Sequence, residues 1–278
     1  MTDILFRNLL STLASFASSN VVVAFDYDGT LAPLVNRPEN ARMRVRTRNL
    51  LAQVARRYPC VIISGRALAD LAPRIGRIPV WHLSGNHGVE PWEPRPAFVA
   101  RVRGWVKELS PRLDGHPGIA IENKRFSLTV HYRRARRRRE ALETILSAVG
   151  SLPEARTIAG ELAVSVLPRE APGKGAALDR VRRALCCDKV IYVGDDETDE
   201  DAFASAAPEL LLAIRIGAEG RSRARYRLKD QRHIDAFLAA LVAFRPVSRR
   251  RAPAAAPSGG PRRRRSAGRR RALSGGSP

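Results

Sequence analysis

The chain has 278 residues, 44% of them hydrophobic, which is enough for one large globular domain or two smaller ones. No apolar run approaches the roughly 18 residues that a membrane-spanning helix needs, and residues 1–20 lack the basic start of a secretory signal. Three cysteines, two of them adjacent, predict no disulfide framework. These features argue against membrane-spanning and disulfide-rich secreted classes, and we expect a soluble, cytoplasmic protein.

The formal net charge of +22 is unusual and unevenly spread. Residues 245–278 hold eleven arginines and no acidic residue, which accounts for half of the excess. Because residues 246–278 contain almost no large apolar side chain, we predict a disordered tail without a part in catalysis. This tail has no aromatic residue to stack on bases, so we expect at most non-specific charge contacts with nucleic acid.

An uninterrupted apolar run at residues 21–25 follows an expected amphipathic helix in residues 1–20. Because the run does not alternate with polar residues, it predicts a strand that is buried on both faces of a parallel sheet. Asp26 and Asp28 follow at the sheet edge where α/β proteins bind ligands, and alternate residues of an extended segment point the same way. From this stretch alone, a simple Asp-Gly turn and a pair of functional carboxylates are both open.

Two more strands are predicted at residues 60–63 and 80–83, with helices at 44–58 and 67–75 before them. Strands and helices that alternate at this spacing indicate βαβ units and a parallel sheet. The first of these strands ends in Ser64-Gly65-Arg66, and the second is followed by a polar segment at residues 84–88.

The pattern changes after residue 96. A helix at 97–109, a hairpin at 118–133, a very basic helix at 134–150 and two short strands at 156–159 and 162–167 follow one another. Such a block between βαβ segments predicts an inserted α+β domain, at residues 99–172. For the arginine run at 133–139 we favour a solvated helix face over a nucleic-acid patch.

The α/β pattern resumes at residue 173. Lys174 opens a helix at 174–186, and a buried strand at 189–194 ends in the acidic segment Asp195-Asp196-Glu197-Thr198-Asp199. A last strand at 213–217 and a closing helix at 232–244 complete the pattern. Residues 1–98 and 173–245 are therefore expected to form the main domain.

Three strand ends thus carry polar clusters, and in a parallel sheet these ends share one edge. Several carboxylates with Ser64 and Lys174 make a set that suits Mg²⁺ and a phosphate group. One aspartate could attack phosphorus, and a second one, two residues on, could protonate the leaving oxygen. The residues therefore predict a phosphoryl-transfer site in which Asp26 is the nucleophile and Asp28 the general acid/base.

FDYDGTLAP, ISGR, the Lys174 helix and VGDDETDEDAF together resemble the four motifs of the haloacid dehalogenase (HAD) superfamily of phosphatases. Segments 84–90 (SGNHGVE) and 122–133 (ENKRFSLTVHYR) resemble trehalose-6-phosphate phosphatases within it, and the resemblance covers roughly residues 20–217. It implies an α/β fold: a HAD-like Rossmannoid parallel-sheet core with an inserted α+β cap of the C2 type. It also implies a Mg²⁺-dependent enzyme that acts on a small sugar phosphate. We expect a monomer.

The resemblance assigns roles to individual residues. It makes Asp26 the nucleophile and Asp28 the general acid/base. The implied metal ligands are Asp26, the carbonyl of Asp28, and Asp195, with Asp199 and Asp196 in support. The implied phosphate contacts are Ser64, Thr30 and Lys174. The implied substrate contacts are Arg66, Asn86, His87 and Gly88 in the core, and Glu122, Lys124 and Arg133 in the cap.

The chain departs from the family pattern in 160-GELAVSVLP-168. Ser165 stands where the family has a sugar-binding glutamate, and Glu161 where it has a lysine. Two alternatives therefore stay open beside trehalose 6-phosphate. One is another sugar phosphate, such as sucrose 6-phosphate or a glucosyl- or mannosyl-glycerate phosphate. The other is a non-catalytic regulatory protein that binds polyanions.

Overall fold

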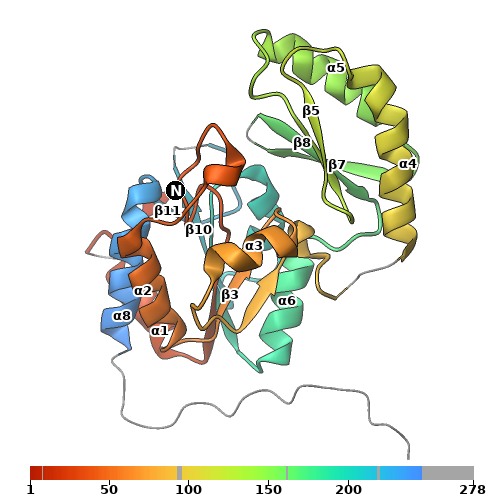
Figure 1. Ribbon diagram of the computed structural model, residues 1–278. Coiled ribbons are helices and arrows are strands. Elements are labelled where there is room, and N and C mark those ends of the chain that lie inside the picture. Colours follow the sequence, from red (N-terminus) through yellow and green to blue (C-terminus); the bar gives the residue numbers. More distant parts are fainter. Residues whose placement is uncertain (8, 93–95, 161, 218–219, 246–278) are drawn as a thin grey trace, which may run out of the picture. The chain divides into compact units, whose positions relative to one another are not determined.

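The computed structural model describes residues 1–7, 9–92, 96–160, 162–217 and 220–245 (Figure 1). The predicted disordered tail at 246–278 and Glu161 lie outside the described residues. Within the described ranges the strands form two sheets, one of seven and one of four strands. None of the helices described there is long and apolar enough to cross a membrane.

The seven-stranded sheet is parallel throughout, with the order β1-β11-β10-β9-β2-β3-β4. Its strands are β1 (Thr2–Asp3), β2 (Val21–Phe25), β3 (Cys60–Ile63), β4 (His82–Ser84), β9 (Lys189–Gly194), β10 (Leu211–Ile216) and β11 (Tyr226–Leu228). The chain runs outward from β2 through β3 to β4, and in the opposite direction from β9 through β10 to β11. The reversal between β2 and β9 is a topological switch point, and open α/β sheets bind their ligands beyond the strand ends at such a point.

Strand β2 is buried on both faces, as its unbroken apolar run predicts. Val21, Val23 and Phe25 belong to one apolar cluster, to which four helices also contribute: α1 (Leu10–Ser18), α2 (Val45–Ala55), α3 (Leu68–Ile75) and α8 (Ile234–Phe244). Val22 and Ala24 belong to a second cluster, with α6 (Lys174–Ala184) and α7 (Glu200–Phe203). Figure 1 shows α1, α2 and α8 gathered together at the sheet. The predicted α/β fold with a covered parallel sheet is therefore confirmed.

The four-stranded sheet is antiparallel, with the order β5-β6-β8-β7. Its strands are β5 (Ala120–Asn123), β6 (Leu128–His131), β7 (Ala155–Gly160) and β8 (Ala163–Pro168). Helices α4 (Pro96–Leu113) and α5 (Arg138–Gly150) cover one face, where Trp105 and Ile145 pack with Leu128 and Val164. Its strands alternate, so the other face carries Glu122, Thr129 and Ser165. The bounds 99–172 for a separate domain stay a prediction.

Some elements differ from the prediction. The basic helix starts only at Arg138, because Ala135 is buried and its N–H donates to the carbonyl of Tyr132 in a turn. The arginines at 136–139 are exposed, and Arg137 and Arg139 form ion pairs with glutamates. Strands β1 and β11 were not predicted, since two or three residues are too few to show a period.

The covered sheet makes a stability prediction at α2. Leu51 is fully buried against the sheet, whereas Val45 on the same helix is 77% exposed. We expect Leu51→Ala to lower the free energy of unfolding by about 2–5 kcal/mol, because it leaves a cavity. Val45→Ala, the matched control, should change it by less than about 0.5 kcal/mol. Urea unfolding followed by circular dichroism measures both, and equal effects would contradict the assigned burial.

Candidate active site

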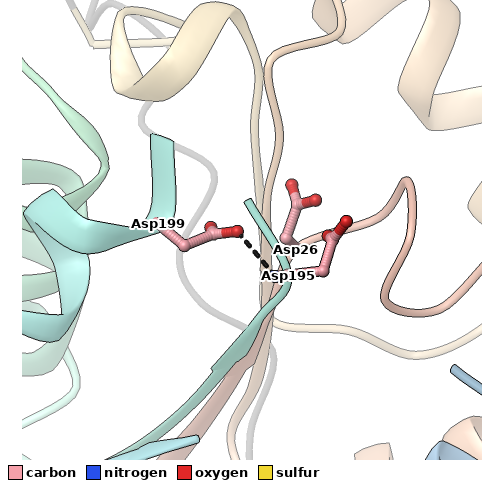
Figure 2. A group of neighbouring side chains, drawn as sticks. All are labelled: Asp26, Asp195 and Asp199. Carbon is pink, nitrogen blue, oxygen red and sulfur yellow. Dashed lines mark hydrogen bonds between the residues drawn. The ribbon is translucent and has the colours of Figure 1, made fainter. Parts of the chain in front are cut away.

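Asp26 and Asp195 stand at the ends of the two strands that flank the switch point. Asp26 directly follows β2, and its backbone N–H donates to the carbonyl of Val193 on β9 at 2.9 Å. Carboxylate oxygens of Asp26, Asp195 and Asp199 lie within 4.8 Å of one another. Figure 2 shows the carboxylates of Asp26 and Asp195 next to each other. The structure therefore brings together acidic residues that are 169 positions apart in the sequence.

The loop after Asp26 is shaped to hold Asp195. Gly29 has a φ of +76°, and a Cβ on it would lie 1.9 Å from Asp195 Oδ2, so the position requires glycine. The Thr30 hydroxyl donates to Asp195 Oδ1 at 3.1 Å. Thr30 is thus engaged with a carboxylate here, and its predicted contact with phosphate stays a prediction.

Asp199 is fully buried and accepts hydrogen bonds at both of its carboxylate oxygens. Its Oδ1 accepts hydrogen bonds from Lys174 Nζ at 2.7 Å and from the Tyr192 hydroxyl at 2.6 Å. Its Oδ2 accepts from the backbone N–H groups of Asp195 at 2.9 Å and Asp196 at 3.1 Å. With both oxygens engaged twice, Asp199 holds the strand end and the lysine in place.

Lys174 is the first residue of α6 and is only 2% exposed. Its ammonium group bridges Asp26 Oδ1 at 3.0 Å and Asp199 Oδ1 at 2.7 Å. A buried cation between two carboxylates offsets part of their mutual repulsion. Since only Oδ1 of Asp26 has a described partner, its Oδ2 remains available on the side of the cavity.

Burial shifts the titration of these groups. It raises the pKa of Asp26 to about 8, against the opposing effect of Lys174 and with a further rise from Asp199. Burial also raises the pKa of Asp195 well above its usual value, and the charge of Asp26 adds to it. The pKa of Lys174 is raised, because Asp199 and Asp26 outweigh the burial that would lower it. The site therefore favours a bound cation or proton among its carboxylates.

The end of β3 supplies Ser64 and Arg66, both buried. The guanidinium of Arg66 pairs with the carboxylate of Asp28 through two bonds, Nε to Oδ2 at 2.6 Å and Nη2 to Oδ1 at 2.7 Å. Ser64 Oγ accepts the backbone N–H of Arg66 at 3.2 Å. The clusters that follow β2 and β3 are therefore in contact, as the shared sheet edge predicts.

The turn Asn86–Gly88 braces the segment after β3. The backbone N–H of Asn86 donates to the carbonyl of Arg66 at 2.7 Å, and that of His87 donates to the carbonyl of Ser64 at 2.9 Å. The His87 ring packs on Gly65, and neither ring nitrogen has a partner among the described residues. Burial lowers the pKa of His87 well below its usual value, with help from the charge of Lys174. The ring is therefore neutral at physiological pH.

Asn86 contacts the hairpin of the four-stranded sheet and does not line the cavity described below. Its side-chain amide donates to Glu90 Oε2 at 2.7 Å and to the carbonyl of Lys124 at 3.2 Å, and Ser127 Oγ donates to its Oδ1. Gly88 has a φ of +113°, and a Cβ there would lie 2.6 Å from the carbonyl of Gly173. Both residues support the architecture in this structure, and their predicted contacts with substrate stay predictions.

A cavity of about 490 Å³ opens over these strand ends. Its walls come from both sheets. From the main sheet side it is lined by Asp26, Asp28, Ser64, Arg66, His87, Lys174 and Asp195. From the four-stranded sheet side it is lined by Glu122, Lys124, Thr129, His131, Arg133 and Ser165. Among the predicted site residues, Thr30, Asn86, Gly88 and Asp199 lie outside this lining and act behind it.

The cavity face of the four-stranded sheet holds a row of polar side chains. His131 Nε2 and Glu122 Oε2 are 2.8 Å apart, and the pairing lowers the pKa of Glu122 despite its partial burial. Lys124 Nζ donates to the carbonyl of Gly65 at 3.2 Å. Arg133 donates to the carbonyl of Val35. These contacts link the sheet to the loops that carry Asp28 and Arg66.

Ser165 stands on β8 directly opposite Thr129 on β6. The two hydroxyl oxygens are 3.1 Å apart, so each can satisfy the other. The position where the family pattern has a glutamate therefore carries a short, neutral side chain that lines the cavity.

Besides Thr129, three side chains of the site were not assigned a role from the sequence. Tyr192 supports Asp199 from inside β9, and Asp70 binds Arg66 Nη1 at 2.6 Å. His131 pairs with Glu122. Only His131 gives a sequence signal, since the alternation in residues 128–131 places it on the same face as Thr129. Tyr192 lies within an apolar run and Asp70 within a helix, where nothing in the pattern distinguishes them.

The comparisons with known proteins agree with this geometry. A family model described as Trehalose-phosphatase matches residues 24–232. The trehalose-phosphate phosphatase of Mycobacterium ulcerans is 32% identical over 214 residues, which cover 71% of this chain and 55% of that protein. The chain thus spans about half the length of this curated relative.

Two solved structures resemble the fold. The trehalose-6-phosphate phosphatase of Aspergillus fumigatus is 28% identical with a TM-score of 0.58, over 87% of this chain and 99% of that one. The C-terminal domain of the C. albicans trehalose-6-phosphate phosphatase has a TM-score of 0.69 at 23% identity, over 87% of this chain and 98% of that one. These likenesses confirm the predicted HAD-like fold. Together with the family model, they establish that the chain belongs to the trehalose-phosphatase family.

Proposed function

We propose that this protein is a Mg²⁺-dependent phosphatase that hydrolyses trehalose 6-phosphate to trehalose and phosphate through an aspartyl-phosphate. One observation carries the proposal. Asp26, Asp195 and Lys174 meet at the switch point of a parallel sheet, below a 490 Å³ cavity whose far wall bears polar side chains. Membership of the trehalose-phosphatase family supports the substrate.

The acidic cluster fits Mg²⁺ in its chemistry. Mg²⁺ is held by one or two carboxylates, with waters and substrate phosphate completing the shell. Asp26 and Asp195 have carboxylate oxygens without described partners, whereas both oxygens of Asp199 are engaged by the protein. We therefore assign Asp26, Asp195 and the Asp28 carbonyl as ligands, with Asp199 and Asp196 in support. A bound Mg²⁺ supplies charge that offsets the developing charge on the transferring phosphate.

The proposed reaction has two steps. A carboxylate oxygen of Asp26 attacks phosphorus and the bond from phosphorus to the sugar oxygen breaks, while Asp28 gives its proton to that oxygen. A water molecule then attacks phosphorus and the bond to Asp26 breaks, while Asp28 takes a proton from the water. Asp26 and Asp28 are thereby restored. Lys174 and Ser64 hold the phosphate oxygens, and the charge of Lys174 favours the ionised form of Asp26 that attacks.

The sugar is proposed to bind beneath the four-stranded sheet, which acts as a cap. Glu122 with His131, and Thr129 with Ser165, present acceptors and donors that suit sugar hydroxyls. Lys124 lies at the border between sugar and phosphate, and we keep Arg66, His87 and Arg133 as proposed contacts of the same cavity. The cap bounds 99–172, a monomeric state and a cytoplasmic location belong to the proposal, and three free cysteines accord with a reducing compartment.

Ser165 favours a second candidate substrate. A site that lacks a carboxylate acceptor for a sugar hydroxyl loses about 1–3 kcal/mol of binding energy. The short Ser165 side chain also leaves more room on β8 than glutamate would. Another sugar phosphate, such as sucrose 6-phosphate or a glucosyl-glycerate phosphate, therefore remains the alternative. A non-catalytic polyanion-binding protein agrees less well with the described site, where Asp26, Asp28 and Lys174, the residues that the proposed chemistry needs, are all present.

We predict strong metal-dependent turnover of one sugar phosphate. The measurement is phosphate release from trehalose 6-phosphate, sucrose 6-phosphate, glucose 6-phosphate and glucosyl-3-phosphoglycerate, each with Mg²⁺ and with EDTA. We expect trehalose 6-phosphate to give the highest kcat/KM, with loss of activity in EDTA. Asp26→Asn, the matched inactive variant, should lower kcat by at least about 10⁴-fold, because the amide is a poor nucleophile.

The outcomes separate the alternatives. Preference for another sugar phosphate would leave the proposed mechanism intact and change the proposed substrate. Ser165→Glu would then be tested for an increase in kcat/KM toward trehalose 6-phosphate. Metal-dependent turnover in Asp26→Asn would overturn the nucleophile assignment. No release from any substrate would leave the polyanion-binding alternative.

The raised pKa of Asp26, about 8, predicts that Mg²⁺ binding releases protons near neutral pH. Below pH 8 the metal-free carboxyl is mostly protonated, and the metal needs it ionised, so Mg²⁺ affinity should rise from pH 6 to pH 8. Calorimetric titrations with Mg²⁺ in two buffers of different ionisation enthalpy measure the proton release. Asp26→Asn should release fewer protons, and identical heats in both buffers for the wild type would contradict the prediction.

A further inference from the structure

Most of the N–H donors of the Arg66 guanidinium are hydrogen-bonded to the protein itself. A guanidinium has five N–H donors. Two of them bind the two oxygens of Asp28, at 2.6 and 2.7 Å, and Nη2 also donates to the carbonyl of Pro38 at 2.7 Å. Nη1 donates to Asp70 Oδ2 at 2.6 Å. One N–H group of the guanidinium is left for a ligand. A residue whose main function is to bind substrate would keep more of its donors for that ligand.

Asp28 and Asp26 are therefore held differently. Lys174 occupies one oxygen of Asp26 and leaves the other toward the cavity. Arg66 occupies both oxygens of Asp28 in the parallel, two-bond geometry that fixes the plane of a carboxylate. Asp28 is one-third exposed and Arg66 is not, so the orientation of Asp28 is set from the protein side.

Arg66 is itself fixed by neighbouring groups. Asp70, in the first turn of α3, is shared between Arg66 and Arg74, and Arg74 donates to Asp70 Oδ1 at 2.8 Å. Arg74 also donates to the carbonyl of Ala41 at 2.9 Å. The backbone carbonyl of Arg66 accepts from Asn86 N–H. Arg66 is therefore held in place by groups of the protein alone.

We propose that Arg66 is a positioning residue that orients the Asp28 carboxylate for proton transfer, and that it is not primarily a substrate contact. The inference rests on the proposed phosphatase function. The two-bond pair keeps the Asp28 carboxylate in one plane at the wall of the cavity, where the proposed reaction needs it next to the sugar oxygen and the attacking water.

The test uses leaving groups of different basicity. Proton donation matters for a sugar alkoxide and matters little for p-nitrophenolate, which leaves without a proton. The substrates are p-nitrophenyl phosphate, phenyl phosphate, an alkyl phosphate and trehalose 6-phosphate, compared by kcat/KM, which reports the step in which the leaving group departs. Arg66→Lys keeps the charge and cannot form the two-bond pair.

We expect Arg66→Lys to lower kcat/KM by about 100-fold or more for the alkyl and sugar phosphates, the range that proton transfer supplies. The loss for p-nitrophenyl phosphate should be far smaller, and that activity also shows that the variant is folded. Arg48→Lys is the matched control, because Arg48 donates to the carbonyls of Arg74 and Ile75 near the end of α3 and has no described contact with Asp28 or Asp70. It should leave the dependence on the leaving group unchanged. Guanidinium ion added to Arg66→Ala should restore sugar phosphate turnover more than methylammonium does.

An equal loss across the whole series would overturn the proposal and make Arg66 a phosphate contact. A rise in KM for trehalose 6-phosphate alone, with kcat unchanged, would overturn it in favour of a sugar contact. If the wild type hydrolyses the aryl and alkyl phosphates but not trehalose 6-phosphate, the proposed substrate fails, and the series still decides the role of Arg66. If the wild type hydrolyses none of them, the proposed function and this inference fail together.

Discussion

The repulsion between the carboxylates of Asp26 and Asp195 is the constraint on which the rest of the site depends. Adjacent parallel strands deliver both groups to one point at the floor of the cavity, where Asp26 is buried and Asp195 partly buried. Two such charges cannot remain ionised there without a counter-charge. Lys174 supplies part of it from the first turn of α6, on the face of the sheet opposite to α1, α2 and α8. The cluster is therefore left with a demand for positive charge that a divalent cation can meet, and the remaining charge of that cation can attract a phosphate ester.

Asp199 shows how the fold tolerates a third buried carboxylate. Its four hydrogen-bond donors include two backbone N–H groups and the hydroxyl of Tyr192. Hydrogen bonds from four donors offset the cost of taking a carboxylate out of water. Asp199 can thus anchor Lys174 without competing with Asp26 for it. Within the acidic segment, Asp195 and Asp196 line the cavity, whereas Asp199 supports them from behind through their backbone N–H groups.

The sequence predicts much of this arrangement for physical reasons. The unbroken apolar runs at residues 21–25 and 60–63 mark strands covered on both faces, and each is followed by polar residues where chemistry is placed. The hydrogen-bond partners of the site residues cannot be predicted from such patterns. Nothing in the spacing shows that Arg66 binds Asp28 and Asp70, or that Asp199 has no free oxygen. Those facts depend on side-chain directions in the folded chain. Strand β1, two residues long, has no periodicity to detect.

The pairing of β2 with β9 has a consequence for the order in which the chain acquires its structure. Residues 21–25 are made well before residues 189–193, their partners on one edge. Until then β2 presents a flat apolar strand with an unpaired edge, which is a site for aggregation. Asp26 likewise emerges without Lys174, so no counter-charge accompanies it. During synthesis β3 and the nearby helices α1 and α2 can cover one edge and one face of β2 early, whereas its other edge stays open until β9 is made and its other face waits for α6.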